Sequence, residues 1–412
     1  MNNAIDNNIF ANPGNLPKRH QIGKIWSTIF FASTTIGIVA LTVLLLSIIN
    51  QAMGLVIIEN KIDPMTLAER PLEELPKEEL ISILQANLSK NRIKTIEKEK
   101  PLDARSQIDI YGLVMERVVQ PTVVKSYTLT QSLLSRSQIE REAVEKYPNA
   151  KIEFRSWINF TFLKKTMSSK PELAGVSTAL MGSLYLIAIT IAVAFPIGVG
   201  AAIYLEEYAN KDNRINKIIQ TNIDNLAGVP SIVYGILGLA IFVRTLETIT
   251  SGAAFGIEGN NGRSILSAGL TMALLILPIL IINAQEAIRA VPDSLRQAAF
   301  GLGATKWQTV WYHVLPNALP GILTGTILAI SRAIGETAPL ILVGASTYIT
   351  TNPSSPFSKF TALPIQIYNW TTRPQDTFRN IAAAAIIVLL ISLLSLNAVA
   401  ILMRNRFSRQ RL

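Results

Sequence analysis

Two ionisable residues lie inside an otherwise apolar stretch, LPGILTGTILAISRAIGETAPLILVGA, which covers residues 319–345. Arg332 is 13 residues beyond Leu319, or about 20 Å along a helix axis. An ionised group at such a depth of a bilayer costs at least about 2.5–3.5 kcal/mol, so it persists where it faces protein or a water-filled path. Glu336 is four residues further on and therefore lies on the same helix face, within pairing reach of Arg332.

The guanidinium of Arg332 offers five donors in a planar fork, which suits an oxyanion, and Glu336 can hold it when no substrate is bound. We therefore expect a substrate path here that includes Ser331 and Thr337. The alternative is an ion pair that only packs helices together. On a helical wheel the pair belongs to a stripe of which half is glycine or alanine, and such small residues admit another helix or leave a lumen. The stripe consists of Gly321, Gly325, Leu328, Ala329, Arg332, Gly335, Glu336 and Pro339. Pro339 also predicts a kink.

The elements that must position these residues are apolar runs long enough to cross a membrane as helices. Six runs qualify, at residues 27–49, 178–205, 226–243, 264–283, 319–345 and 381–403. The first has an apolar core too long for a signal peptide and no clear cleavage site, so we interpret it as an uncleaved span.

The distribution of lysine and arginine predicts the orientation of these spans. Thirteen of these residues flank one side of the spans, and the short loops on the other side carry five. We therefore expect a multi-pass protein of the bacterial inner membrane. Its cytoplasmic parts would be residues 1–26, 206–225, 284–318 and 404–412.

Residues 50–177 form a segment of different composition, in which 36 of 128 residues are charged, against 30 of the other 284. Residues 64–88 have amphipathic helical periodicity. The stretches at 118–129 and 150–162 have strand-like composition. We expect a small α+β insertion outside the membrane, between the first two spans, without a recognisable catalytic constellation.

Composition excludes several classes of function. The chain has no cysteine and two histidines, His20 and His313. These numbers exclude a thiol nucleophile and argue against a multi-histidine metal site. The net charge of +10 lies beside apolar spans, which favours membrane topology over nucleic-acid binding. A nucleotide-binding GxxxxGK[ST] motif is absent, so ATP and its magnesium would belong to a partner.

The segment at 284–318 is too apolar and too helical for a linker. SLRQAAFGLGA follows Pro292, with Asp293 or Ser294 as the expected N-cap and with Gly301 and Gly303 expected to end or bend the helix. A short amphipathic helix at the membrane surface either receives a soluble partner or anchors the bundle.

This segment resembles the EAA loop of ABC importer permeases. The family pattern is Glu-Ala-Ala, three residues, Gly, nine residues, Ile-x-Leu-Pro. The chain has Gln297, Ala298 and Ala299, then Gly303, then HVLP from His313. The spacing is intact, while Gln297 replaces glutamate and His313 replaces isoleucine. The first replacement removes a possible salt bridge to the partner.

The chain resembles the PstA-type permeases of phosphate importers over roughly residues 178–412. The resemblance is carried by the segments around the EAA loop and by the stretches AGVPSIVYGILGLAIFV and LPIQIYNWTTRP. The resemblance implies an all-α membrane protein with the six transmembrane helices of the type I ABC importer (MetI-like) fold, in which 178–403 is the permease core. It implies a PstC-like second permease, two PstB-like ATPases and a PstS-like phosphate-binding protein, besides membrane lipid. ATPase coupling would centre on Gln297, Ala298, Ala299, Gly303 and Ala304.

Three other functions compete with a phosphate permease. A permease for another oxyanion, such as sulfate or molybdate, would share the EAA loop. A sensor would use 50–177 as its ligand domain, but no cytoplasmic signalling module follows the last span. An intramembrane enzyme would need more than one Arg–Glu pair, and HExxH and GxSxG motifs are absent.

Overall fold

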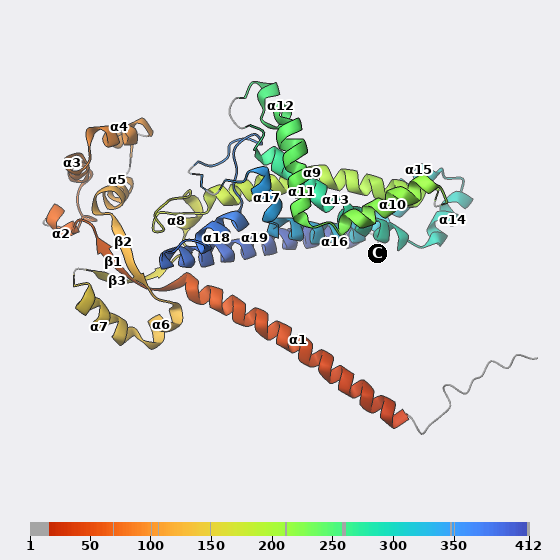
Figure 1. The fold of residues 1–412 in the computed structure, drawn as a ribbon, viewed down its shortest axis with the longest axis horizontal. Coiled ribbons are helices and arrows are strands. Elements are labelled where there is room, and N and C mark those ends of the chain that lie inside the picture. The colour runs from red at the N-terminus through yellow and green to blue at the C-terminus, as the bar shows by residue number, and fades with distance from the viewer. Residues whose placement is uncertain are drawn as a thin grey trace, which may run out of the picture.

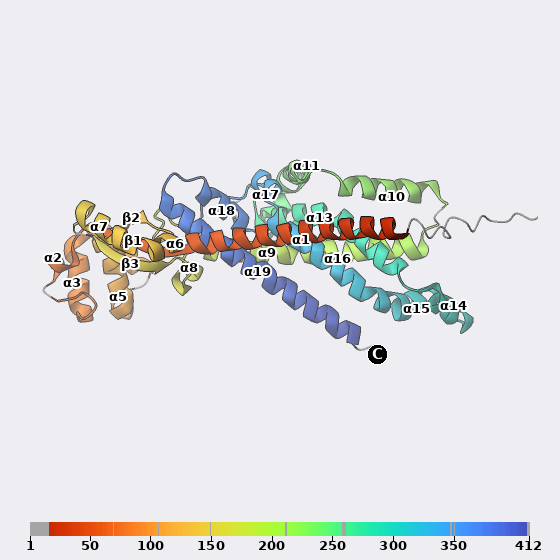
Figure 2. The same cartoon turned by 90° about the horizontal axis from the view of Figure 1, so that it is seen from below.

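The computed structural model describes residues 16–409 except 69, 100, 106, 149, 211, 258–260, 347 and 350. Parts of the predicted cytoplasmic segments 1–26 and 404–412, and Lys211, therefore lie outside the described residues. The molecule is elongated (Figure 1). An α+β unit lies at one end, helices α14 and α15 lie at the other, and long helices run between them (Figures 1 and 2).

Helices make up the long part of the molecule. Their bounds are α1 (Leu16–Ala52), α9 (Ser177–Ile203), α10 (Arg214–Ala227), α11 (Ser231–Gly238), α12 (Glu247–Thr250), α13 (Ile265–Arg289), α14 (Asp293–Gly301), α15 (Lys306–Thr309), α16 (Leu315–Gly335), α17 (Ala338–Val343), α18 (Leu363–Thr371) and α19 (Asp376–Arg409). Wider π-helical turns are η5 (Tyr204–Tyr208), η6 (Leu239–Thr245) and η8 (Val310–Val314), and η7 (Ala253–Phe255) is a 3₁₀ turn.

The α+β unit is built on an antiparallel sheet of order β2-β1-β3, with a register shift between Ile57 and Ile58. Its elements are β1 (Met53–Asn60), β2 (Pro121–Ser126), β3 (Lys151–Ser156), α2 (Pro64–Leu67), α3 (Lys77–Asn87), α4 (Lys90–Glu99), η3 (Leu102–Ala104), α5 (Gln107–Val114), η4 (Met115–Val119), α6 (Leu129–Leu134), α7 (Arg136–Lys146) and α8 (Phe160–Lys164). The strand-like stretches at 118–129 and 150–162 contain β2 and β3. The central strand β1 was not predicted.

Five helices are long and apolar enough to cross a membrane, within the residues that the structure describes. They correspond to five of the six predicted spans. The fifth prediction, 319–345, is too long, because its helix ends at Gly335. The third prediction, 226–243, is wrong as a continuous span, because α10 and α11 meet at an angle of 106°. Pro230 caps α11 with an extended ψ of 137°, and a proline also disfavours helical backbone at the residue before it. Counted as one broken span, α10 and the α11–η6 helix give six.

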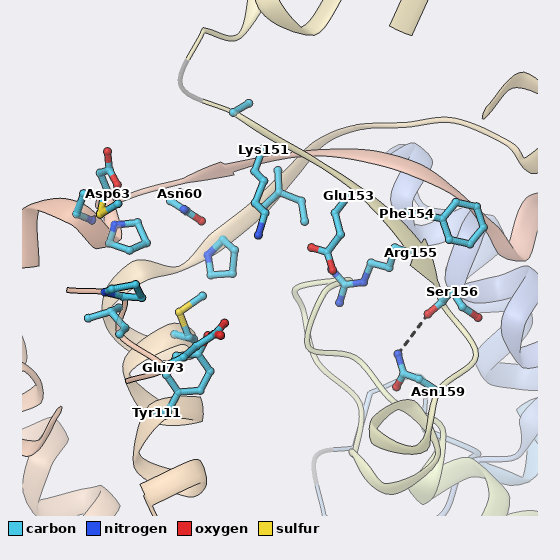
Figure 3. Close-up of a pocket in the computed structure, with 18 of the residues that line it drawn as sticks. Asn60, Asp63, Glu73, Tyr111, Lys151, Glu153, Phe154, Arg155, Ser156 and Asn159 are labelled. Carbon is cyan, nitrogen blue, oxygen red and sulfur yellow. Dashed lines mark hydrogen bonds between the residues drawn. The ribbon is translucent and has the colours of Figure 1, made fainter. Parts of the chain in front are cut away.

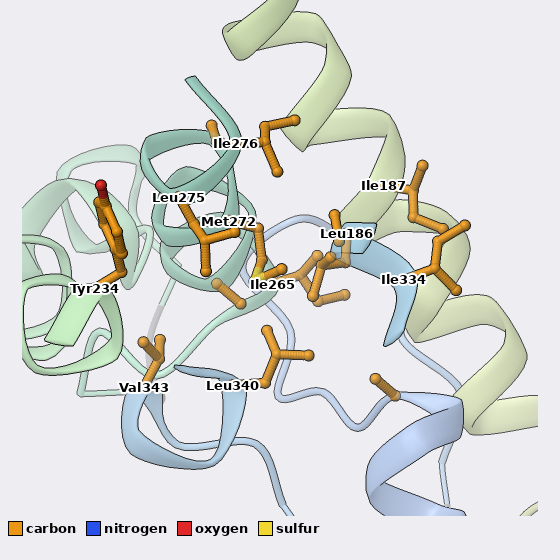
Figure 4. Close-up of a cluster of buried hydrophobic side chains, with 14 of the residues drawn as sticks. Leu186, Ile187, Tyr234, Ile265, Met272, Leu275, Ile276, Ile334, Leu340 and Val343 are labelled. Atoms are coloured by element: carbon orange, nitrogen blue, oxygen red, sulfur yellow. The ribbon is translucent and has the colours of Figure 1, made fainter. Parts of the chain in front are cut away.

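Helix α1 is apolar from about Ile25 onward, yet only Ala52 is buried. Such a helix is stable where lipid or another subunit covers it. The other spans share a core around α13, in which α9 and α17 contribute Leu186 and Leu340 against Met272 and Ile276 (Figure 4). Tyr234 of α11 lies at the edge of this cluster.

The α+β unit is joined to the helices by a buried cluster that includes Trp157, Phe162, Trp370 and Phe378. Asn380 of α19 accepts a hydrogen bond from Ser126 Oγ at 2.8 Å and donates one to the Gln51 carbonyl at 2.8 Å. These contacts fix the unit against the start of α19.

Candidate functional site

Arg332 and Glu336 form the predicted pair at the end of α16. The Arg332 Nε lies 3.4 Å from Glu336 Oε1. The arginine side chain is 48% exposed and that of the glutamate 20%. One long contact to a half-exposed guanidinium leaves most of its five donors available to an anion.

The depth of Arg332 follows from the neighbours of α16. Gly325 lies against Asn283, and Gly321 lies against Ala287. Continuing this antiparallel register places Arg332 beside Ile276, near the middle of α13. On the other side, Ser331 Oγ lies 2.9 Å from Asn397 Oδ1 and Thr324 Oγ1 lies 3.4 Å from Arg404 Nη1. Arg332 therefore lies about 12 Å, or eight helical residues, further along the helices than Arg404.

The backbone leaves the helix between these residues and α17. Gly335 is the last residue of α16, and Glu336 has an extended ψ of 120°. Helix α17 restarts at Ala338 with Pro339 in its first turn. The kink expected at Pro339 is therefore a complete break that begins at Glu336.

The stripe of small residues has two different surroundings. Gly321, Gly325 and the buried Ala329 face other helices, and a Cβ at Gly321 would lie 2.8 Å from that of Ala287. Leu328, Arg332 and Gly335 are exposed. The GxxxG pattern thus packs α16 on α13, although Gly321 itself remains exposed at one end of the contact.

The two hydroxyl residues proposed beside Arg332 differ in position. Ser331 is half-buried and bonded to Asn397 of α19, so its hydroxyl lies in a helix interface. Thr337 precedes α17 in the break, partly exposed, and its side chain does not cap the helix. Thr337 therefore lies in the break, directly after Glu336, whereas the Ser331 hydroxyl is engaged by α19.

Helix α14 is the predicted coupling helix. Pro292, not Asp293 or Ser294, is its N-cap, and the helix ends at Gly301. Gln297, Ala298 and Gly303 are exposed, whereas Ala299 is 4% exposed and its carbonyl accepts the amide of Ala304 at 3.0 Å. Gly303 has a φ of +79° with no atom near its missing Cβ. Its role within this chain is therefore a left-handed turn.

Exposed apolar side chains surround this turn, and the resemblance to the EAA loop did not point to them. Leu302 is 90% exposed. Phe300, Trp307, Trp311 and Tyr312 are also exposed, and the rings of Trp307 and Trp311 stack at 5.3 Å. The sequence pattern that could have predicted this surface is the pair Trp307 and Trp311 in KWQTVWYH, which are four residues apart and so share a helix face.

Arg296 connects α14 to the membrane helices, a role for which no local sequence pattern is a signal. Its guanidinium lies 2.8 Å from Glu207 Oε1 in η5, with side chains 16% and 9% exposed. It also donates to the carbonyls of Val291 at 2.7 Å and Ile288 at 3.0 Å. One side chain thereby joins the coupling helix to the ends of α9 and α13.

A cavity of about 960 Å³ lies away from these residues, in the α+β unit. Figure 3 shows Lys151 and Arg155 beside Asp63, Glu73 and Glu153. Burial lowers the pKa of Arg155, whose guanidinium lies over the Trp157 ring at 4.7 Å. Because three carboxylates and two cations line this cavity, its charge does not favour the binding of an anion. Among the described residues, no group of three His, Asp or Glu side chains is placed to hold a metal.

The chain is similar to known membrane transport proteins. The family model described as "Binding-protein-dependent transport system inner membrane component" matches residues 194–411. The chain is 35% identical over 239 residues to phosphate transport system permease protein PstA 1 of Mycobacterium tuberculosis, covering 58% of this chain and 73% of that protein. It is 31% identical over 257 residues to the probable ABC transporter permease YqgI of Bacillus subtilis, covering 60% and 83%.

Solved structures of ABC transporters also match. A chain of a bacterial importer of the acidic polysaccharide alginate has a TM-score of 0.43 and 18% identity, covering 67% of this chain and 91% of that one. A chain of the methionine transporter MetNI has a TM-score of 0.41 and 14% identity, covering 57% and 94%.

The protein is a membrane permease of an ABC importer, without a catalytic activity of its own. It belongs to the family of binding-protein-dependent transport system inner membrane components, and within that family to the PstA-type permeases.

Proposed function

We propose that this chain is the transmembrane permease subunit of an ATP-driven inorganic phosphate importer. The proposal rests on the guanidinium of Arg332, which is half-exposed beside Glu336 and lies level with the middle of α13. The relatives of the chain include phosphate permeases. The half-exposed face of Arg332 is the side on which a PstC-like second permease would complete the path. Arg332 and Thr337 would contact the anion, while Glu336 would hold the guanidinium between transport cycles.

The geometry also supports an orientation. The α+β unit lies at the end of the molecule opposite to α14 (Figure 1). The described start of α1 and the described end of α19 lie toward the α14 end (Figures 1 and 2). We place that end in the cytoplasm, so that both termini are cytoplasmic and residues 50–177 are outside, where a PstS-like binding protein delivers phosphate.

Two PstB-like ATPases would supply the work, with ATP and magnesium bound to them. One would receive α14 through Gln297, Ala298 and the turn at Gly303. Ala299 and Ala304 would support that surface from beneath. Closure of the ATPases would move α14, and Arg296 would pass the movement to α9 and α13 as a rigid-body rotation.

Reconstituted uptake tests this function. The purified complex of this chain with its ATPase, second permease and binding protein should accumulate labelled phosphate in liposomes only with ATP. A hundredfold excess of sulfate or molybdate should not compete. Uptake of sulfate in preference to phosphate would refute the phosphate assignment, and uptake without any ATPase would refute the class.

A further inference from the structure

We propose that a cationic cavity at the end of α17 is a second anion site, which receives inorganic phosphate before it reaches Arg332. The cavity measures about 690 Å³ and is lined by Arg244, Arg263 and Lys359, with Glu247 as its carboxylate. Asn261 and Ser346 add polar groups to the same wall. This inference rests on the proposed function and extends it to a further site.

The three cations come from separate parts of the chain, and the backbone holds them together. Gly262, at a φ of +68°, packs directly on the backbone of Val243, which places Arg263 beside the η6 residue Arg244. The amide of Ile265 donates to the Ser358 carbonyl at 3.2 Å, which fixes the Lys359 loop against the start of α13. The cavity is thus organised before an anion enters.

The charges in the cavity are unbalanced. All three cations are exposed, and in the described part of the chain none lies within 4 Å of a carboxylate to form an ion pair. Glu247 lines the same cavity without closing on Arg244. Three like charges that converge on one hollow repel one another, and a multivalent anion such as phosphate relieves that repulsion.

The position of the cavity connects it with the proposed path. Helix α17 begins beside the Arg332–Glu336 pair and ends at Gly344, which lines the cavity. A Cβ at Gly344 would lie 2.6 Å from the Cδ of Arg263, so this arginine lies directly across the end of α17. An anion held here would be one short helix away from Arg332.

The test is the double substitution Arg263→Gln with Lys359→Gln in the complete reconstituted complex, at saturating binding protein. We expect initial phosphate uptake to fall roughly tenfold, while the binding protein still stimulates ATP hydrolysis, so that less phosphate moves per ATP. Uptake by the wild type should also fall more steeply between 25 and 250 mM salt than uptake by the variant.

Two controls separate charge in the cavity from charge in general. Arg263→Lys with Lys359→Arg keeps both charges and should keep most of the uptake. Arg379→Gln removes one cation from an exposed pair with Asp376, outside the cavity, and should leave uptake unchanged.

The proposal is overturned if the double variant transports like the wild type. It is also overturned if the variant needs only more binding protein for half-maximal ATPase stimulation, because the cations would then dock a protein. A wild-type complex that moves no phosphate would refute the proposed function itself, whereas phosphate uptake that is indifferent to these charges refutes this site alone.

Discussion

Arg296 of α14 and Glu207 of η5, the turn that continues α9, form an ion pair at 2.8 Å that is almost closed to solvent. The pair lies 89 residues apart in sequence and is reinforced by two carbonyls at the end of α13. Because α14 ends in an exposed turn, this side chain is its main polar connection to the membrane helices. We therefore expect this pair to pass a movement of α14 to the ends of α9 and α13.

Replacing Arg296 with Ala should uncouple ATP hydrolysis from transport. The substitution leaves Glu207 and two carbonyls without their partner, and breaking a buried pair in this way costs about 3–5 kcal/mol. The ATPase should still copurify, because the exposed docking residues remain, but phosphate transported per ATP should fall. Asp293→Asn, which removes the 85% exposed partner of Arg296, is the matched control and should change little. The coupling role of Arg296 would be contradicted if the variant lost ATPase binding while the complexes that still hold the ATPase moved a normal amount of phosphate per ATP.

Gly303→Ala should weaken ATPase docking, because the φ of +79° costs a residue with a Cβ roughly 1–2 kcal/mol. Gly301→Ala, at the open end of α14, is the control and should preserve docking, since alanine favours the helix. Copurification of the ATPase measures both variants. Equal docking by the two would show that the turn is not required.

Gly325→Ala should destabilise the packing of α16 on α13. The added methyl would overlap the Asn283 side chain, and overpacking of this kind typically costs about 1–3 kcal/mol. Gly335→Ala adds the same methyl where nothing lies within 4 Å. Thermal unfolding of the purified complex should separate these variants, and equal midpoints would mean that the helices do not pack in this register.

Glu142 of α7 should make the α+β unit sensitive to acid. Hydrogen bonds from Lys125, Tyr127 and Lys146 lower its pKa from 4.5 to about 2. The ionised Glu142 therefore stabilises the folded α+β unit fully above pH 4.5, and this stabilisation is lost as the pH falls from 4.5 toward 2. Amide exchange in residues 136–146, corrected for intrinsic rates, should increase over that interval. Glu142→Gln should abolish this increase, and Glu140→Gln, which removes a surface pair with Arg136, should retain it.

The membrane helices could be predicted from the sequence because apolar length determines them. The same reasoning placed Arg332 and Glu336 on one face, because the i,i+4 relation is local. Strand β1 was missed, since its apolar residues continue directly from α1 and carry no period-two pattern. The break before Pro230 was also missed, because hydrophobicity alone does not report backbone direction.

The contacts of the site that join residues far apart in sequence could not be predicted from any local sequence pattern. Arg296 meets Glu207 only once α9, α13 and α14 have packed. Likewise, Arg244, Arg263 and Lys359 come together only through the contacts of Gly262 and Ile265. Ser331 was grouped with Arg332 because it is adjacent in sequence. Adjacent helical residues point about 100° apart, and its hydroxyl faces Asn397 of α19.

The substrate role of Arg332 is the central claim, and phosphate uptake by Arg332→Gln in the assembled complex tests it most directly. We predict that uptake falls by at least about a hundredfold, as expected when a charged clamp on an oxyanion is removed, while all subunits still copurify. Arg332→Lys should restore little, because an ammonium lacks the planar fork. Uptake at the wild-type rate by Arg332→Gln would contradict the account.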